Sequence, residues 1–482
     1  MTQLEEKISS QNKLILIILI LGNFVSLISE TVMNVALPSI ISEFSVSTST
    51  AQWLTSGYML VIGISIPVSA FLIQRFTLRQ LFIAGVSFFS IGSLIAFITP
   101  TFSLLLIGRI IQALGTGMIM PLIMNVVLLV VPVSKRGTMM GLVTVVIMLA
   151  PAIGPVVSGF ILQYYSWRTI FLILLALGLI VLVIAFFKLH NITETTKVKI
   201  HIPSILLSTI GFGGIVYGFS TAGREAGWGN PIVWVTLAVG IVALILFVRQ
   251  QNKMDSPMLN MKPFTLPVFS KSTLLMFFTM MILFSMMLIL PLYFQTALNM
   301  SPMKTGLLML PGSLILAFMG LVAGKLFDKI GFKPLVLSGL AIVTIVLCLF
   351  TTISTETTIT KAMGLYATFT IGAGFALGPI MTLALNQLPK PLYAHGSAIF
   401  NTFNQIAGAI GPALYTSIMT MASQRFVETS NETNEALLQT EALTQGVHTV
   451  YYVALAFAVI SFVLALTLKK KDQFVEAEYI TL

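Results

Sequence analysis

The most regular feature of the chain is a succession of long apolar runs separated by short polar segments. A helix needs about 20 predominantly apolar residues to cross the hydrocarbon core of a bilayer. Fourteen such runs can be marked: 14–37, 51–73, 81–99, 102–126, 138–162, 167–187, 202–222, 231–249, 271–296, 304–327, 334–353, 361–385, 394–422 and 447–468. Only helices and closed barrels pair every backbone group in lipid, so the pattern predicts fourteen transmembrane helices.

The composition agrees with an all-α polytopic membrane protein. The 482 residues are 57% hydrophobic and 9% charged, whereas soluble domains carry about 25% charged residues. The single cysteine, Cys348, excludes a disulfide framework, and we expect it to be a small buried side chain. No His/Cys/Asp cluster has metal-ligand spacing, and no G-x-x-x-x-G-K-[ST] loop is present. The sequence therefore predicts neither a metal nor another cofactor.

The Lys and Arg residues predict the orientation of the chain in the membrane. With the N-terminus inside, 20 of the 26 fall in cytoplasmic segments and 5 in outer ones, and Arg109 lies within a run. Cytoplasmic loops carry such a basic excess, so both termini are expected to be cytoplasmic. The net charge of +10 is thereby explained without a nucleic-acid partner.

An internal repeat divides the chain. AFLIQRFTLRQLF after the second run resembles GKLFDKIGFKPLV after the tenth, and PAIGPVVSG in the fifth resembles GAIGPALYT in the thirteenth. Both pairs are separated by about 255 residues, which predicts a six-helix half at 1–190, two inserted helices at 191–255 and a second half at 256–482. Such repeats place a substrate path between the halves, near the middle of the bilayer.

Two formal charges lie deep within the apolar runs, Glu30 and Arg109. An intramembrane charge costs about 2.5–3.5 kcal/mol on insertion scales and usually faces a cavity or a partner. One interpretation is a structural ion pair between the two residues. The other is that Glu30 carries protons, because burial favours the neutral form of a carboxylic acid. Asn34, one helical turn from Glu30, shares its face.

Four motifs resemble those of the fourteen-helix drug:proton antiporters of the major facilitator superfamily, such as the lincosamide and multidrug exporters of Gram-positive bacteria. The stretch SETVMNVALP, with Glu30 at the acidic position, is similar to the signature of their first helix. The cytoplasmic loop motif G-x-L-x-D-R-x-G-R-R is well kept in the second half and degraded in the first, where Gln74 replaces the acid. The loop residues that match are Arg75, Arg79, Gly324, Asp328, Gly331 and Lys333.

The other two motifs lie in the fourth and fifth runs. LLLIGRIIQALGTGMIMP resembles the motif whose arginine is linked to proton transfer, with Arg109 and Gln112 in place. APAIGPVVSG resembles the antiporter motif, with Gly154, Pro155 and Gly159 in place; symporters of the superfamily generally lack it. Its glycines and proline are equally suited to close helix packing and to bending the helix.

The resemblance implies the major facilitator fold with 6+2+6 helices, and export of small amphipathic drugs or metabolites in exchange for protons. Glu30 and Arg109 are the expected proton-coupling residues. The expected substrate cavity includes Asn34, Tyr58, Gln112, Asn401 and Gln405. The expected protein is a monomer in a bacterial plasma membrane.

Other functions remain open at this stage. Relatives with these motifs could export one endogenous metabolite, lipid or signalling nucleotide. A proton-coupled uptake symporter is disfavoured by the motif of the fifth run, and a channel by the two-half symmetry. An intramembrane enzyme would need a nucleophile–base pair or a metal cluster, and neither is found in the sequence.

Overall fold

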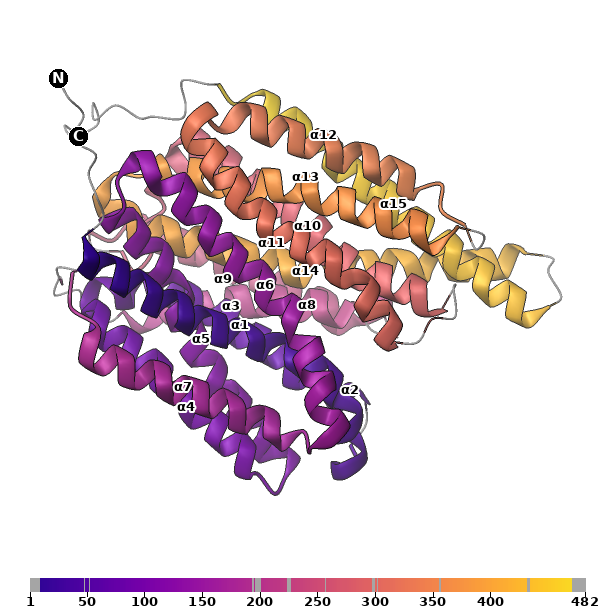
Figure 1. The fold of residues 1–482 in the computed structure, drawn as a ribbon, viewed down its shortest axis with the longest axis horizontal. Helices are drawn as coiled ribbons and strands as arrows, with labels where there is room; N and C mark the ends of the chain where they lie inside the picture. Colours follow the sequence, from indigo (N-terminus) through magenta and orange to yellow (C-terminus); the bar gives the residue numbers. More distant parts are fainter. Residues whose placement is uncertain are drawn as a thin grey trace. The chain divides into compact units, whose positions relative to one another are not determined.

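The computed structural model describes residues 9–469 apart from short gaps at 47, 52, 193–194, 196–200, 223–226, 256, 297–299, 301, 355–356 and 431–433. Every regular element in the described part of the chain is a helix (Figure 1). Fourteen of these helices are long and apolar enough to cross a membrane. The predicted all-α, fourteen-helix architecture is therefore confirmed.

Most of the helices are longer than the apolar runs that predict them, because their ends continue into polar sequence. The first run, expected at 14–37, lies within a helix of 35 residues. The helices of the first part of the chain are α1 (Ser10–Phe44), α2 (Thr48–Ala51), α3 (Trp53–Arg75), α4 (Leu78–Ile98), α5 (Phe102–Val130), α6 (Arg136–Tyr164), α7 (Arg168–Lys188), α8 (Ile202–Ala222) and α9 (Pro231–Gln251). Those of the second part are α10 (Pro267–Thr296), α11 (Pro302–Ile330), α12 (Phe332–Phe350), α13 (Ile359–Asn386), α14 (Tyr393–Thr429) and α15 (Glu435–Leu466).

The chain forms two compact units that are not continuous in sequence. Unit 1 comprises Met1–Gly214, Val239–Thr265 and Leu388–Gln405. Unit 2 comprises Ile215–Ala238, Leu266–Gln387 and Ile406–Leu482. The boundaries that the repeat predicts, at 190/191 and 255/256, stay a prediction.

In unit 1, α5 is the central helix and packs against α1, α3 and α4. Glycines allow its close approach to α4. A Cβ at Gly92 would lie 2.5 Å from the carbonyl oxygen of Gly108, and one at Gly85 would lie 3.2 Å from that of Gly115. Small residues at such crossings let helix backbones meet in a membrane. The helices α6 and α7 complete the packing around α1 and α4.

In unit 2, α13 takes the place that α5 has in unit 1. It packs against α10, α11 and α12, and α15 packs against α10 and α12. A Cβ at Gly339 would lie 2.6 Å from the carbonyl oxygen of Gly372, and one at Gly372 would lie 2.7 Å from that of Gly339. The helices around α13, and the contacts of α15, thus follow the same order as those around α5 and the contacts of α7.

The turns that carry the repeated loop motif are built differently. Between α3 and α4, Thr77 caps the helix and forms a reciprocal capping box with Gln80. Between α11 and α12 the equivalent position is Gly331, whose φ of 83° lies in the left-handed region that favours glycine. This difference explains why the second copy keeps its glycine and the first does without one.

A cluster of polar and aromatic side chains ties the end of α1 to the α6–α7 turn. Arg168 Nη1 lies 2.6 Å from Glu43 Oε1, and Trp167 Nε1 donates to Glu43 Oε2 at 2.6 Å. Arg168 Nη2 donates to the carbonyl oxygen of Thr99, and its guanidinium lies 4.3 Å from the Trp167 ring centroid. We call Glu43, Trp167, Arg168 and Thr99 the α1 brace.

The α14–α15 connection of unit 2 is longer than the α6–α7 turn. The ends of α14 and α15 extend beyond the neighbouring helices of unit 2 (Figure 1). Ser423 Oγ donates to the carbonyl oxygen of Ala442 at 2.9 Å, which joins the two helices near this end.

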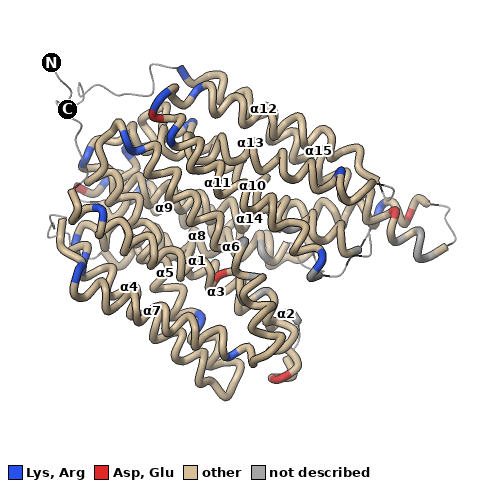
Figure 2. Tube along the Cα trace, in the orientation of Figure 1, with Lys and Arg blue, Asp and Glu red and all other residues tan. Residues whose placement is uncertain are grey.

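Most Lys and Arg residues lie near helix ends along the chain trace (Figure 2). In unit 1, Arg79 Nη2 donates to the carbonyl oxygen of Phe186 at 2.6 Å, so the start of α4 lies beside the end of α7. The side of the membrane that these ends face stays a prediction of the Lys/Arg bias.

One expectation about burial is wrong. Cys348 is exposed on the surface of α12 instead of buried. In a membrane-spanning helix such a side chain faces lipid, which is as apolar as a protein core, so the apolar run around Cys348 does not distinguish the two positions.

Candidate functional site

The site is built around Glu30 on α1, where the hydroxyl residues Ser29 and Thr31 flank it. Glu30 and Thr31 are partly buried, and Val32 and Met33, which follow them, are buried. The helix begins after Ser9, whose hydroxyl accepts a hydrogen bond from the backbone amide of Asn12. The helix accommodates Glu30 because its backbone hydrogen bonds form between residues four positions apart, whatever their side chains. Asn34 also lies in α1, but its side chain is outside the described residues.

Arg109 of α5 is the largest fully buried side chain, with 0% of its surface exposed. Its Nη1 donates to Ser29 Oγ at 2.8 Å and to Gln112 Oε1 at 2.7 Å. Its Nε donates to the carbonyl oxygen of Leu54 on α3 at 3.2 Å. A buried charge needs such acceptors, and here they come from three helices, none of them a carboxylate.

Tyr58 of α3 closes the other side of the guanidinium. The Arg109 Cζ lies 3.9 Å from the centroid of the Tyr58 ring, within the range of a cation–π interaction. The Tyr58 hydroxyl and Thr116 Oγ1 are 2.7 Å apart. Tyr58 is therefore held at both its ring and its hydroxyl, as expected for a residue that shapes a site.

Gln112 extends the network to α4. Its Nε2 donates to Ser93 Oγ at 2.7 Å, and Ser93 Oγ donates in turn to the carbonyl oxygen of Phe89. The fixed partners define the amide orientation of Gln112, with Oε1 toward Arg109 and Nε2 toward Ser93. We call the set Ser29, Glu30, Tyr58, Ser93, Arg109, Gln112 and Thr116 the α5 network.

The ion pair between Glu30 and Arg109 is not formed in this structure. All hydrogen bonds of the guanidinium go to the oxygens of Ser29, Leu54 and Gln112. Arg109 Nη2 is buried and has no hydrogen-bond partner among the described residues. A guanidinium presents five donors, so Arg109 keeps donor capacity beside the helix that carries Glu30.

The antiporter-motif residues of α6 lie against the same segment of α1. A Cβ at Gly154 would meet the Thr31 side chain, so α6 crosses α1 next to Glu30. Ser158 Oγ donates to the carbonyl oxygen of Val32 at 2.9 Å and fixes this crossing. Gly159 is exposed with nothing near it, and the side chain of Pro155 lies outside the described residues. Only Gly154 of the three is therefore placed at a helix contact.

The loop-motif residues lie at or near the ends of helices within their own units. Arg75 ends α3 and is exposed, and the Arg79 backbone amide donates to Asn191 Oδ1. Gly324 is buried in α11, Asp328 is partly buried near the end of the same helix, and Lys333 lies in the first turn of α12.

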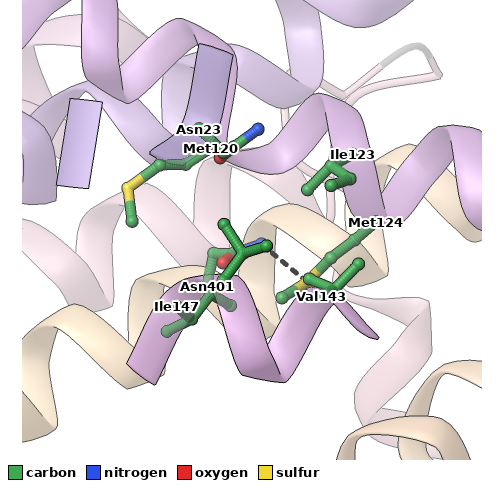
Figure 3. A pocket seen from close by; sticks show the side chains of 8 residues that line it. Asn23, Met120, Ile123, Met124, Val143, Ile147 and Asn401 are labelled. Atoms are coloured by element: carbon green, nitrogen blue, oxygen red, sulfur yellow. Dashed lines mark hydrogen bonds between the residues drawn. The ribbon is translucent and has the colours of Figure 1, made fainter. Parts of the chain in front are cut away.

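The two amides expected from α14 have different positions. Asn401 is buried and lines a narrow pocket of unit 1, where its Nδ2 donates to Met124 Sδ (Figure 3). Gln405 is partly buried and does not line this pocket.

Sequence reasoning missed three polar residues that the structure uses. Ser29 and Ser93 hold Arg109 and Gln112, and Asn23 lines the same pocket as Asn401. Asn23 precedes Glu30 by seven residues, a spacing that puts both on one face of a helix and could have identified it. Ser29 and Ser93 could not be identified from the sequence, since serines are also common in helices that have no binding role.

Among the described residues, no group of three or more His, Cys, Asp or Glu side chains could hold a metal ion. The polar groups of the site are instead buried amides, hydroxyls and one guanidinium, together with the partly buried carboxylic acid of Glu30. This set can bind and release a proton and can hydrogen-bond a small molecule.

Comparison with known proteins identifies the family. The profile of the Major Facilitator Superfamily matches residues 19–412. The chain is 44% identical over 467 residues to the lincomycin resistance protein LmrB of Bacillus subtilis, covering 96% of this chain and 98% of that protein. It is 40% identical over 451 residues to LmrB of Listeria monocytogenes, covering 94% and 95%. It is 26% identical over 410 residues to the probable multidrug resistance protein EmrY of Escherichia coli, covering 83% and 78%.

Solved structures show the same fold at low sequence identity. The human organic anion transporter MFSD10 aligns with a TM-score of 0.69 at 11% identity, over 94% of this chain and 99% of that one. The proton:xylose symporter XylE aligns with a TM-score of 0.66 at 16% identity, over 97% and 98%. Family profile, relatives and fold agree, and the chain therefore belongs to the major facilitator superfamily, as a multi-pass transporter of the plasma membrane.

Proposed function

We propose that the protein is a proton-coupled antiporter that exports small amphipathic organic compounds by alternating access. The observation that carries the proposal is Glu30, an acid in a membrane-spanning helix that makes no ion pair with the nearby buried arginine. Relatives at 40–44% identity are named for lincomycin resistance, which supports export of drug-like compounds.

Glu30 takes a proton from the outside when the site opens outward and releases it when the site opens to the cytoplasm. A carboxylic acid in an apolar, partly buried position is easily kept neutral, and it ionises when its surroundings become more polar. Arg109 stays charged throughout the cycle. Its Nη2, which has no partner among the described residues, is available to the ionised Glu30 in one state and not in the other, so that the guanidinium biases proton release.

Substrate and proton compete in this scheme. A compound that binds near the ionised acid from the cytoplasmic side is carried outward, and protonation of Glu30 then favours its release. Tyr58 and Gln112 are fully buried in the α5 network in this state, so they would contact the compound only in a state that opens toward them. Gly154 would let α6 move against α1 beside Glu30.

A second candidate is export of one endogenous metabolite, lipid or signalling nucleotide with the same coupling. The names of the relatives favour the broader drug-exporting function. Uptake by symport is less well supported, because the likeness to the xylose symporter is one of fold alone.

The topology completes the proposal. Both termini lie in the cytoplasm, the six-helix halves 1–190 and 256–482 carry out the rocking movement, and α8 and α9 are inserted between them. The protein acts as a monomer, and its partners are protons, the exported compound and the lipid bilayer. Cysteines introduced at 426–445 should react with an impermeant reagent from outside, and those at 191–199 should not; the reverse pattern would overturn this orientation.

Glu30→Gln tests the coupling. The amide cannot release a proton, so uphill export of lincomycin driven by a pH gradient should fall to background in everted vesicles, while Glu30→Asp should keep much of the activity. The matched control is Glu428→Gln, the same change at an exposed acid of α14. Full uphill export by Glu30→Gln would show that the carboxylate is structural and would end the proposal.

A further inference from the structure

A narrow pocket of unit 1 lies among α1, α5, α6 and the first part of α14 (Figure 3). Its volume is about 10 Å³, which is close to the space that one water molecule requires. In this conformation it therefore admits one small chemical group. Four of its lining side chains are aliphatic and two are thioethers: Ile123, Val143, Val146, Ile147, Met120 and Met124.

The remaining two lining residues are asparagines whose orientation is fixed. Asn23 Nδ2 donates to the carbonyl oxygen of Leu19 at 2.9 Å, and Asn401 Nδ2 donates to that of Ser397, also at 2.9 Å. A backbone carbonyl can only accept a hydrogen bond, so the nitrogen of each amide must face it. Each Oδ1 is therefore turned away from its own helix backbone.

Both amide oxygens keep their full acceptor capacity. Among the described residues neither Asn23 Oδ1 nor Asn401 Oδ1 accepts a hydrogen bond, whereas Asn401 Nδ2 also donates to Met124 Sδ at 3.1 Å. The amides come from opposite sides of the pocket in Figure 3. A pocket with two free acceptors in apolar walls suits a group that donates hydrogen bonds.

The charge of the lining argues against an anion. None of the eight lining residues is charged. A phosphate or carboxylate placed here would face two carbonyl oxygens and would lose its hydration without gaining a cation, which is costly in an apolar setting.

We propose that this pocket is a subsite for a single hydrogen-bond donor group, an ammonium or a hydroxyl, of the exported compound. The group that enters the pocket is then neutral or cationic, and a phosphate or carboxylate group is disfavoured there. The inference rests on the proposed export function and narrows its substrate class. Met120 and Met124 are flexible and polarisable, so they adapt to apolar bodies of different shape around the same donor.

Equilibrium binding to the purified full-length protein in lipid nanodiscs tests the subsite. The probes are ethidium, an apolar cation with two amino groups; tetraphenylphosphonium, an apolar cation with no donor; and carboxyfluorescein, an anion. Ethidium should bind most tightly and carboxyfluorescein should not bind. Equal affinity for the two cations, binding of neither, or binding of the anion would overturn the proposal.

Variants of Asn23 and Asn401 test whether the preference for a donor arises in this pocket. Asn23→Leu and Asn401→Leu should each weaken ethidium binding about fivefold, as for loss of one net hydrogen bond, and leave tetraphenylphosphonium binding unchanged. Asn404→Leu is the matched control, because Asn404 lies on the same helix but does not line the pocket. Asn401→Asp keeps an acceptor oxygen and should bind ethidium at least as well as the unaltered protein. This variant tests the acceptor role even if a leucine variant loses binding because it misfolds.

The result of the binding experiment is independent of the Glu30→Gln transport experiment, because binding in nanodiscs is measured without a proton gradient. A donor preference that survives in both leucine variants would overturn the subsite and leave antiport untouched. Loss of uphill transport in Glu30→Gln together with an intact donor preference would support both proposals.

Discussion

The α5 network of unit 1 and the equivalent place in unit 2 share a backbone arrangement but not a chemistry. The glycine pair Gly85–Gly115 of unit 1 recurs as Gly339–Gly372 in unit 2. Arg109 lies six residues before Gly115, and Tyr366 lies six residues before Gly372. The buried arginine of one unit is thus replaced by a buried tyrosine in the other.

The partner on the neighbouring helix changes as well. Tyr58 and Gly312 both lie sixteen residues before the loop-motif position that Gln74 or Asp328 occupies. In unit 1 the Tyr58 ring covers the arginine, and in unit 2 the Tyr366 ring lies where a Cβ of Gly312 would be. One aromatic ring fills the same space in both units, contributed by α3 in the first and by α13 in the second.

The remaining members of the network become apolar in unit 2. Ser93 corresponds to Leu347, and Gln112 corresponds to Phe369. Glu30 corresponds to Phe284, because Thr31 touches Gly154 as Ser285 touches Gly411. The equivalent place of unit 2 is therefore packed without a charged side chain, so this helix arrangement does not by itself require one.

The largest expected effect, on transport, comes from replacing the guanidinium of Arg109. Arg109→Lys cannot reach Ser29, Gln112 and Leu54 together, so uphill export in vesicles should fall about 5- to 150-fold, the range of coupling free energies of 1–3 kcal/mol. Tyr366→Phe at the equivalent place of unit 2 should transport normally. Equal loss in both variants would mean that the two places have the same role.

The glycine contacts that both units share predict the same effect on stability in each unit. Gly115→Val and Gly372→Val each force side-chain atoms into the facing backbone, and each should lower the free energy of unfolding by about 1–3 kcal/mol. Thermal unfolding in detergent measures this, with Gly364→Val as the control because nothing lies within 4 Å of a Cβ there. A loss confined to one unit would break the structural equivalence.

A smaller difference should separate the two tyrosines. The Tyr58 hydroxyl and Thr116 Oγ1 are 2.7 Å apart, whereas the Tyr366 hydroxyl and Ser313 Oγ are 3.5 Å apart. Tyr58→Phe should therefore cost about 1 kcal/mol of stability, and Tyr366→Phe should cost less. The same unfolding assay compares them, and a larger cost for Tyr366→Phe would contradict the difference in hydrogen bonding.

The smallest effect on stability is expected at the α1 brace. Its short, hydrogen-bonded α6–α7 turn in unit 1 corresponds to the longer α14–α15 connection of unit 2. Burial tends to raise the pKa of Glu43, but hydrogen bonds from Trp167 and Arg168 and the charge of Arg168 outweigh it, so the pKa lies below its usual 4.5. The stabilisation is then complete above about pH 5 and is lost as the pH falls through the lowered pKa.

Glu43→Gln should cost about 0.2–1 kcal/mol at pH 7, because the pair is partly exposed. The cost should be nearly constant between pH 5 and 8 and should shrink in stronger acid, as measured by thermal unfolding in detergent. Glu441→Gln, at an exposed acid of α15, is the control. A cost that grows as the pH falls would have the wrong sign for a lowered pKa.

Much of the architecture followed from sequence because it depends on local properties. A run of about 20 apolar residues must become a helix in lipid, whatever surrounds it, so the fourteen helices could be counted directly. Glu30 and Arg109 stood out for the same reason, since a charge is rare at that depth. The family followed from motif residues such as Gly154 and Asp328, which keep their spacing along the chain.

Only the tertiary structure decided which groups meet. Arg109 bonds the backbone oxygens of Ser29 and Leu54, and every residue has such an oxygen, so no residue type marks them in advance. Asn23 and Asn401 are far apart in the chain but line one pocket, and Cys348 faces outward within a run as apolar as those of the core. Helix formation is set within a few residues along the chain, whereas side-chain partners are set by how closely distant helices approach, here at glycines such as Gly85 and Gly115.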